Sequence, residues 1–286
     1  MIDIIYRYDP NAEVRCSSPA TPSEASQRLC KGNREFASVL DLPPGQSQVT
    51  RIIPFEMRAV GMSDEDGVAP CQQPFAIVLG CSDARVPIEM IFDQACNDLF
   101  VVRVAGNVLG SECLGSIDYA IRNLGQSLKL IVVLGHNGCG AVTAAVDAYL
   151  EPTRYLSIAA SHHLRSIVDR IFVAVRASSQ ALESVHGPGV SRRKGYRAAL
   201  IETAVVLNAA LTAKTLKREF QDSVSTGIGI AYSIYHLGTR EVNLPINDGP
   251  DISATLFEPP SSEKEFGDIG VQLASCHAIA HLLESK

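Results

Sequence analysis

The chain has 286 residues, of which 46% are hydrophobic, so it is long and apolar enough to bury one large core or two small ones. Its formal net charge of −6 at neutral pH excludes the broad basic surface that nucleic-acid-binding proteins present. Charges interrupt the apolar residues of the N-terminus, and no stretch approaches the roughly 20 apolar residues of a membrane span. The sequence therefore predicts a cytoplasmic protein without nucleic-acid or membrane partners.

Cysteine usage gives a first indication of chemistry. Eight cysteines are spread along the chain, and no export signal accompanies them. This argues against a disulfide scaffold and favours metal binding or catalysis for some of them, with the others serving as small buried apolar residues. The eight are Cys16, Cys30, Cys71, Cys81, Cys96, Cys113, Cys139 and Cys276.

The N-terminal part is predicted to contain one helix between two irregular segments. Residues 1–22 are rich in proline, serine and turn-forming residues, and they are expected to form an arm. Residues 23–40 show the helical spacing of apolar side chains, with Ser23 as the predicted N-cap and Gly32 as the predicted break. Residues 41–72 are expected to form a loop.

The middle of the chain alternates strands with helices. Short, continuous runs of Val, Ile and Leu are typical of parallel strands that are buried on both faces, and helix-compatible segments separate these runs. The alternation predicts an α/β fold with a mostly parallel, doubly wound central sheet of four to five strands flanked by helices. The predicted strands are 74–80, 99–106 and 129–135, and the helical segments between them are 87–94 and 114–125.

The C-terminal half completes this sheet. Two long helices, about 155–183 and 195–220, precede a fourth strand at 226–237. Residues 241–245 are expected to pair with this strand as an antiparallel hairpin at the sheet edge. An irregular segment, 246–268, leads to a short terminal helix. The chain thus divides into an N-terminal arm, a main domain and a C-terminal extension, at residues 1–22, 23–245 and 246–286.

Soft metal ligands follow two of the predicted strands at the point where each strand ends. Cys81 follows the first strand, and His136 follows the third, with Cys139 three residues later. Because the carboxyl ends of neighbouring parallel strands meet at one edge, the three side chains are expected to converge if these strands are adjacent. Zn²⁺ prefers thiolate and imidazole ligands, and three protein ligands leave a fourth position open, as in catalytic zinc sites.

Each half of this pattern also has an ordinary structural explanation. A buried strand can end in a cysteine, and a single histidine is more often hydrogen-bonded in a core than bound to a metal. The pairing of two strand ends with matching Val-Leu-Gly lead-ins favours the metal site. The segment Cys-His-Ala-Ile-Ala-His at 276–281 could form a second metal tract, but its spacing is that of an ordinary helix.

Two charged residues complete the turn after Cys81. Zinc that carries two thiolates is formally neutral, so it acidifies a bound water less than zinc held by neutral imidazoles, and it gains from a carboxylate that orients the resulting hydroxide. Asp83 is placed for that role, and Arg85 can hold it away from the metal through a bidentate pair. The alternative is a solvated ion pair on a loop, which contributes little.

Several segments share the pattern of one known family. CSDARVPIEMIFD contains a Cys-x-Asp-x-Arg motif, and GHNGCGAV contains a His-x-x-Cys-Gly motif. The segments DLFVVRVAGNV, LGSIDYAI and LCKGNREF add to the likeness. Together they resemble the bacterial branch of the β-class carbonic anhydrases, with interruptions, from about residue 27 to residue 245.

The resemblance implies an enzyme that catalyses the reversible hydration of carbon dioxide to bicarbonate and a proton. It implies that Cys81, His136 and Cys139 bind one Zn²⁺ per subunit, and that Asp83 and Arg85 form a catalytic dyad. In such an enzyme, zinc-bound hydroxide attacks the carbon of CO₂. We expect activity to rise with pH, because hydroxide and the Asp83 carboxylate compete for the metal.

The resemblance also suggests substrate contacts. CO₂ is uncharged, so the site needs an apolar lining, for which Val86, Ala105 and Gly106 are the candidates. Gln94 is a candidate donor to bicarbonate. The family's usual Arg-Asn-Ala-Gly-Asn is Arg-Val-Ala-Gly-Asn here, with Val104 in place of the asparagine, which alters packing behind the cleft without removing a ligand.

The resemblance implies a homodimer or a dimer of dimers, because members of the family form dimers that often pair into tetramers. Residues 1–22 and 246–286 have no clear counterpart in the family. They could add to a subunit interface, cover the cleft or dock the enzyme to a larger assembly, including one within a protein-shelled compartment.

Other functions remain open at this point. Hydrolysis of CS₂ or COS would use the same hydroxide on another linear molecule, and the shape of the access channel would decide between the substrates. A non-catalytic zinc module would keep Asp83 as a permanent fourth ligand, although such a ligand needs no Arg85 to restrain it. A thiol-redox function is weaker, because Cys81 and Cys139 are far from a Cys-x-x-Cys arrangement.

Overall fold

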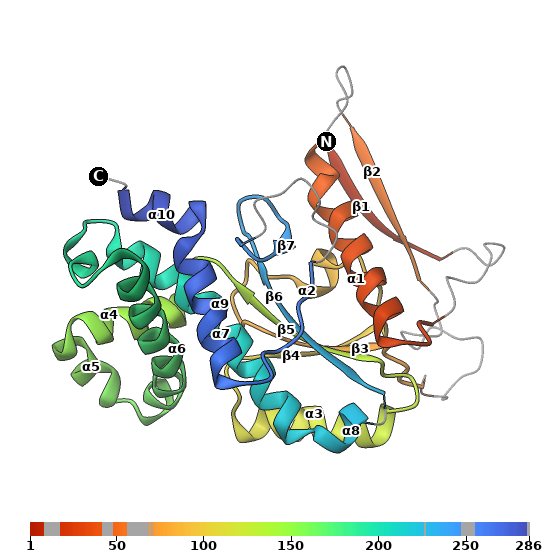
Figure 1. The fold of residues 1–286 in the computed structure, drawn as a ribbon. Coiled ribbons are helices and arrows are strands. Elements are labelled where there is room, and N and C mark those ends of the chain that lie inside the picture. Colours follow the sequence, from red (N-terminus) through yellow and green to blue (C-terminus); the bar gives the residue numbers. More distant parts are fainter. Residues whose placement is uncertain are drawn as a thin grey trace.

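A five-stranded sheet forms the centre of the molecule (Figure 1). The structure is a computed structural model that describes residues 1–8, 18–41, 48–55, 69, 71–225, 227–246 and 255–284. The strands of the sheet are β3 Ala76–Gly80, β4 Leu99–Arg103, β5 Leu130–His136, β6 Gly229–Tyr235 and β7 Val242–Asn243. Their order is β4-β3-β5-β6-β7, with β7 antiparallel and the others parallel. The predicted fold class and the predicted edge hairpin are confirmed.

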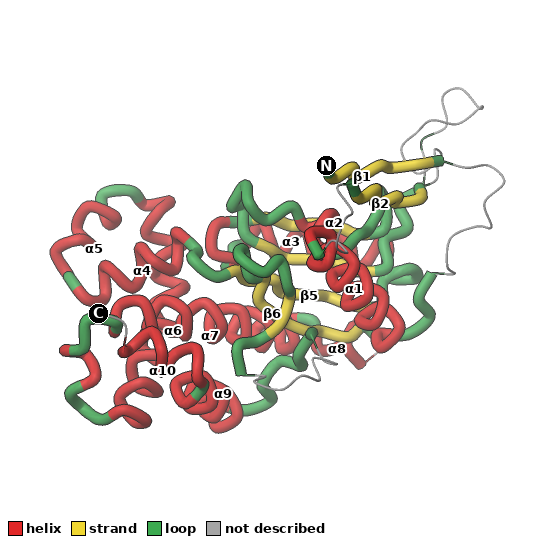
Figure 2. Tube along the Cα trace, turned by 90° about the horizontal axis from the view of Figure 1, so that it is seen from above, coloured by secondary structure: helices red, strands yellow, loops and turns green. Residues whose placement is uncertain are grey.

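Helices cover both faces of this sheet. They are α1 Pro22–Ala37, α2 Ile88–Ile91, α3 Ser111–Leu124, α4 Gly140–Leu150, α5 Pro152–Ala159, α6 His162–His186, α7 Tyr196–Glu219, α8 Gln221–Ser225, α9 Glu263–Ser275 and α10 His277–Glu284. Short 3-10 turns lie at Ser38–Leu40, Ala105–Asn107 and Val190–Arg192. Figure 2 shows α4, α5, α6, α9 and α10 gathered to one side of the strands.

The alternation of side chains explains why the strands are continuous apolar runs. Every residue of β3 and β5 is buried. Ile77 and Leu79 of β3 belong to the larger core, which includes residues of α3, α6 and α7, whereas Ala76 and Val78 belong to a smaller core with residues of α1 and α2. Successive side chains of a strand point to opposite faces, so a strand that is covered on both faces needs an apolar residue at every position.

Helix α7 forms the apolar centre of the helical part. Its 24 residues pack against β5, β6, α6, α9 and α10. The helix has a mean hydropathy of 1.3 over its most apolar window, so by length and composition it could cross a membrane, in contrast to the expectation from sequence. However, 78% of that window is buried inside the protein, which is the burial of a core helix.

The N-terminal part contains two strands that were not predicted. Strands β1 Ile2–Arg7 and β2 Val49–Pro54 form a separate two-stranded parallel sheet, in which Ile2 pairs with Val49. An arm and a loop were expected here, and residues 9–17, 42–47, 56–68 and 70 of those predictions lie outside the described residues. Each strand depends on a partner distant in sequence, so its own residues give only a weak signal.

Helix α1 differs from its prediction at both its cap and its predicted break. Thr21, rather than Ser23, occupies the N-cap position, and its Oγ1 accepts a hydrogen bond from the backbone N–H of Glu24 at 3.2 Å. The helix also continues through Gly32. A Cβ atom at this position would lie 1.8 Å from the carbonyl oxygen of Phe92, so Gly32 permits close packing instead of ending the helix.

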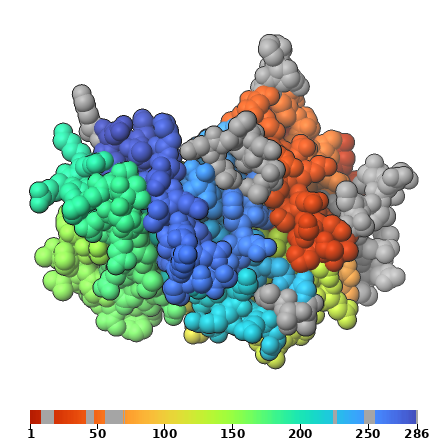
Figure 3. Space-filling model, viewed as in Figure 1, coloured from red at the N-terminus to blue at the C-terminus, as the bar shows by residue number. Residues whose placement is uncertain are grey.

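The other helix boundaries differ because polar caps interrupt the predicted segments. The predicted helix at 155–183 is two helices, and the hydroxyl of Ser161 caps the second of them. Helix α9 begins at Glu263, inside the segment that was expected to be irregular, and the hydroxyl of Ser262 caps it. Cys276 adopts an extended backbone conformation and separates α9 from α10. Helix α9 packs against α6 and α7, and α10 packs against α7. Figure 3 shows this C-terminal segment, in dark blue, beside the green helical part on one face of the molecule.

Replacing Gly32 by alanine is expected to lower the free energy of unfolding by about 1–3 kcal/mol, because overpacking outweighs the gain of about 1 kcal/mol in helix propensity. Gly115 of α3 is the matched control, since nothing lies within 4 Å of a Cβ atom there. Gly115→Ala should therefore stabilise the protein by up to about 1 kcal/mol. Chemical denaturation measures both variants. Unchanged or increased stability of Gly32→Ala would show that α1 does not need this close approach.

Candidate metal centre

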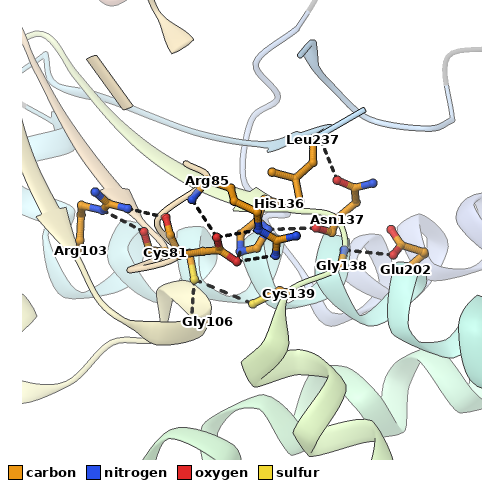
Figure 4. A network of polar contacts seen from close by, with 11 residues as sticks. Cys81, Arg85, Arg103, Gly106, His136, Asn137, Gly138, Cys139, Glu202 and Leu237 are labelled. Carbon is orange, nitrogen blue, oxygen red and sulfur yellow. Dashed lines mark hydrogen bonds and ion pairs between the residues drawn. The ribbon is translucent and has the colours of Figure 1, made fainter. Parts of the chain in front are cut away.

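Three soft ligands converge at the carboxyl edge of the sheet (Figure 4). Cys81 follows the last residue of β3, His136 is the last residue of β5, and Cys139 occupies the N-cap position of α4. Strands β3 and β5 are adjacent and parallel, with Gly80 opposite Leu134, so the two strand ends lie side by side. All three side chains are buried, and their ligand atoms lie within 4.8 Å of one another. The convergence that the sequence predicted is confirmed.

The imidazole of His136 leaves one nitrogen free. Its Nδ1 lies 3.0 Å from the carbonyl oxygen of Asn137, an arrangement that favours the proton on Nδ1. Its Nε2 is buried and has no hydrogen-bond partner among the described residues. A buried nitrogen without a partner is costly unless it binds a ligand, so Nε2 is the candidate metal-binding atom.

The two thiols influence each other strongly. The hydrogen bond from Cys139, with smaller contributions from His136 and the backbone around Asp83 and Gly106, lowers the pKa of Cys81, although burial opposes the shift. The neighbouring Cys81 sulfur and burial raise the pKa of Cys139. One thiolate therefore forms readily, while the second needs a nearby positive charge. A divalent cation supplies that charge.

The donor set and its spacing fit zinc. Two Zn–S bonds of about 2.3 Å at a tetrahedral angle place their sulfurs about 3.8 Å apart. The Sγ atoms of Cys81 and Cys139 are 3.9 Å apart. Two sulfurs and one imidazole nitrogen leave a fourth position for a small ligand. Within the described part of the chain, no other three His, Cys, Asp or Glu side chains bring their ligand atoms this close together. The tract at 276–281 therefore does not form a second group of this kind.

The side chains of Cys81, His136 and Cys139 are called the metal group below. Asp83 lies beside this group and is held by Arg85. Arg85 Nε is 2.9 Å from Asp83 Oδ1, and Arg85 Nη2 is 2.7 Å from Asp83 Oδ2, which is the predicted bidentate pair. The hydrogen bonds from Arg85 hold the pKa of Asp83 well below its usual range, so this carboxylate stays ionised at neutral pH. Asp83 Oδ2 is also 3.8 Å from His136 Nε2. The negative charge of Asp83 is thus fixed next to the metal group, while both carboxylate oxygens accept hydrogen bonds from Arg85.

Arg103, at the end of β4, holds the turn that carries Cys81 and Asp83. Its Nε donates to the carbonyl oxygen of Cys81 at 3.0 Å, and its Nη2 donates to the carbonyl oxygen of Asp83 at 2.6 Å (Figure 4). Strand β4 neighbours β3, so the position of Arg103 at a strand end is the sequence signal for this role. It was not predicted, because arginine is not a soft metal ligand.

The loop that joins the last two ligands is held by two distant elements. The backbone N–H of Gly138 donates to Glu202 of α7 at 3.2 Å, and Asn137 Oδ1 accepts from the backbone N–H of Leu237 at 2.8 Å (Figure 4). Gly138 has a φ of 62°, a left-handed conformation that favours glycine. Burial raises the pKa of Glu202. No sequence pattern links Glu202 to this loop, so its contact was not predicted.

Gly106, Ala105 and Val86, the residues expected to line the substrate site, occupy different surroundings. The backbone N–H of Gly106 donates to Sγ of Cys81 at 3.4 Å, so the turn that contains Ala105 and Gly106 adjoins the metal group. Val86 follows the Asp83–Arg85 turn and is fully buried in the smaller core. The role of all three in binding CO₂ stays a prediction.

Gln94 is engaged with the N-terminal helix. Its Oε1 accepts a hydrogen bond from Nε of Arg28 at 2.9 Å, and its Nε2 donates to the carbonyl oxygen of Phe92 at 2.6 Å. The side chain is buried, with 3% of the residue exposed. No hydrogen bond in the described structure connects it to the metal group, and its role in bicarbonate binding stays a prediction.

Known relatives identify the family. The family model described as carbonic anhydrase matches residues 76–242. Carbonic anhydrase 2 of Mycobacterium tuberculosis is 38% identical over 154 residues, which are 54% of this chain and 64% of that relative, so the match spans just under two thirds of the relative's length. The carbonic anhydrase of Mycolicibacterium smegmatis is 33% identical over 227 residues, which are 79% of this chain and 94% of that relative.

A solved structure also resembles the chain. A tetrameric β-carbonic anhydrase from the ascomycete Sordaria macrospora matches with a TM-score of 0.49 and 19% identity, over 60% of this chain and 81% of that chain. The family model covers more than half of the chain, and its range includes Cys81, His136 and Cys139. The chain therefore belongs to the carbonic anhydrase family.

Proposed function

We propose that the protein is a zinc-dependent enzyme that catalyses the reversible hydration of CO₂ to bicarbonate and a proton. The observation that carries this proposal is the group of Cys81, His136 and Cys139, with a carboxylate oxygen 3.8 Å from the imidazole. Membership of the carbonic anhydrase family supports it. A zinc ion held by the three ligands supplies the Lewis acidity that makes a water molecule nucleophilic toward CO₂ near neutral pH.

The charged residues of the site orient the nucleophile. Asp83 accepts a hydrogen bond from the attacking water and directs a lone pair toward CO₂, and its lowered pKa keeps it able to accept at neutral pH. Arg85 donates to both carboxylate oxygens and so restrains Asp83 from binding the metal. Arg103 fixes the backbone of the same turn, so these groups are positioned before the substrate arrives.

Uncharged CO₂ needs an apolar surface beside the nucleophile, and the turn Ala105–Asn107 can provide part of it. Gly106 of this turn contacts Sγ of Cys81. A Cβ atom at Gly106 would lie 3.0 Å from Ile171 and 3.1 Å from Ala141, and the left-handed φ of 67° also favours glycine, so a larger residue would strain this turn. No feature of the described site favours CS₂ or COS over CO₂.

Metal content and CO₂ hydration, measured on one purified sample, test the proposal. We expect about one zinc per chain together with rapid hydration. Cys139→Ser should retain less than about a tenth of the zinc and of the activity, because a neutral hydroxyl is a poor zinc ligand. Cys96→Ser, at an exposed cysteine outside the group, is the matched control and should retain both. Zinc without turnover would favour a non-catalytic zinc module, and wild-type protein without zinc would contradict the proposal.

Arg85→Ala should lower kcat/KM for CO₂ hydration by about 10²–10³-fold, because the released Asp83 carboxylate can bind the metal and close the site. Since hydroxide competes with that carboxylate, wild-type activity should rise with pH, and the variant's profile should be displaced to higher pH. Arg122→Ala breaks an exposed pair with Asp118 and is the control, with an expected loss of less than about twofold. Stopped-flow measurements across pH decide, and an unchanged Arg85→Ala profile would remove Arg85 from the mechanism.

A further inference from the structure

A cavity lies beside the metal-binding loop, which is the segment 137–138 that joins His136 to Cys139. Its volume is about 520 Å³, which is the size of a site for a small organic molecule. Asn137, which follows the ligand His136, lines it, as does Glu202, which accepts the hydrogen bond from Gly138. The three metal ligands and the Asp83–Arg85 pair do not line it. The cavity is therefore separate from the metal group, but Asn137 of the loop that joins two of the ligands lines it.

The wall of this cavity is largely apolar. Its apolar side chains come from α7, β6 and the C-terminal helix α10, elements that are far apart in the sequence. They include Val205, Val206, Ile234, Ile279 and Leu282. A surface of this kind favours a ligand with an apolar body, because burial of apolar area drives its binding.

The polar groups of the cavity favour a cation. Among the described residues that line it, Glu202 is the sole carboxylate, and lysine and arginine are absent. The other polar side chains of the lining are Asn137, His236, His277 and His281. Burial raises the pKa of Glu202, and the hydrogen bond from Gly138 offsets only part of this shift, so a cation in the cavity would stabilise the ionised carboxylate. His236 also lines the cavity, and its buried Nε2 has no hydrogen-bond partner among the described residues. Burial lowers the pKa of His236, so this side chain is neutral and does not offset the carboxylate.

We propose that this cavity binds a small organic amine, with its apolar body against the wall and its protonated nitrogen paired with Glu202. A carboxylate or phosphate ligand would be repelled by Glu202. A metal ion would lack ligands, because the described residues of the cavity form no group of three with sufficiently close ligand atoms. The proposal goes beyond CO₂ hydration, and binding at this site does not depend on that reaction.

Binding of a ligand in the cavity affects the metal-binding loop. The Glu202 carboxylate accepts the backbone N–H of Gly138 at 3.2 Å, so an ammonium group that pairs with the same carboxylate acts directly on that contact (Figure 4). Coupling between two binding sites is reciprocal. An amine that binds here therefore changes the affinity of the protein for the metal, and the metal changes the affinity for the amine by the same factor.

Titration calorimetry of the full chain with benzylamine, benzyl alcohol and benzoate tests the proposal. These probes share an aromatic body and differ in charge. We expect benzylamine to bind at least about tenfold more tightly than benzoate, with benzyl alcohol between them. Saturating benzylamine should also change the rate at which a chelator removes the metal by at least about twofold. Equal binding of benzylamine and benzoate would overturn the proposal, and an unchanged rate of metal removal would overturn the coupling.

Two variants locate the binding. Glu202→Gln removes the charge but keeps an oxygen that can accept the Gly138 hydrogen bond, and it should weaken benzylamine binding at least about tenfold. Glu219→Gln makes the same change on the same helix outside the cavity, and it should bind as the wild type does. Ala278→Trp should fill the cavity and abolish binding of all three probes. Benzylamine binding that survives Glu202→Gln or Ala278→Trp in folded protein would place the amine elsewhere and overturn the proposal.

Discussion

The parallel pairing of β3 with β5 is the constraint on which the site depends. It places Gly80 opposite Leu134, so Cys81 and His136 emerge side by side. A shift of one residue would turn every side chain of β5 to the other face and remove the imidazole from the thiols. The glycines before the two ligands serve this packing: a Cβ atom at Gly80 would lie 2.6 Å from Ile88, and one at Gly135 would lie 2.7 Å from Ile234.

The rest of the fold holds these strand ends in place. Arg103 reaches the Cys81 turn from β4, while Glu202 of α7 and the backbone of Leu237 reach the loop that follows His136. Each contact comes from a different neighbouring element, so the site cannot move as a unit without disturbing the sheet or α7. The contacts of Arg103 and Glu202 involve charged groups, and such hydrogen bonds contribute about 1.5–3 kcal/mol each, so they restrain the backbone around the ligands before a metal binds.

Much of this arrangement could be predicted from the sequence, because its signals are local. Continuous apolar runs identified the parallel strands, and soft ligands at two strand ends identified the metal group. Strand β2 and the contact of Glu202 with the loop could not be predicted, since each depends on a partner distant in the chain. The break predicted at Gly32 is wrong for the same reason: helix propensity predicts a break, whereas close packing against Phe92 requires the glycine.

X-ray absorption spectroscopy at the zinc edge of the metal-loaded chain tests the central claim most directly. The account predicts two sulfur neighbours at about 2.3 Å and two nitrogen or oxygen neighbours at about 2.0 Å, with one of the latter an imidazole. Cys81, His136 and Cys139 supply three of these four atoms. A coordination shell without sulfur, or one with four sulfurs, would contradict the account, because the metal would then lie outside this group or leave no position for a substrate.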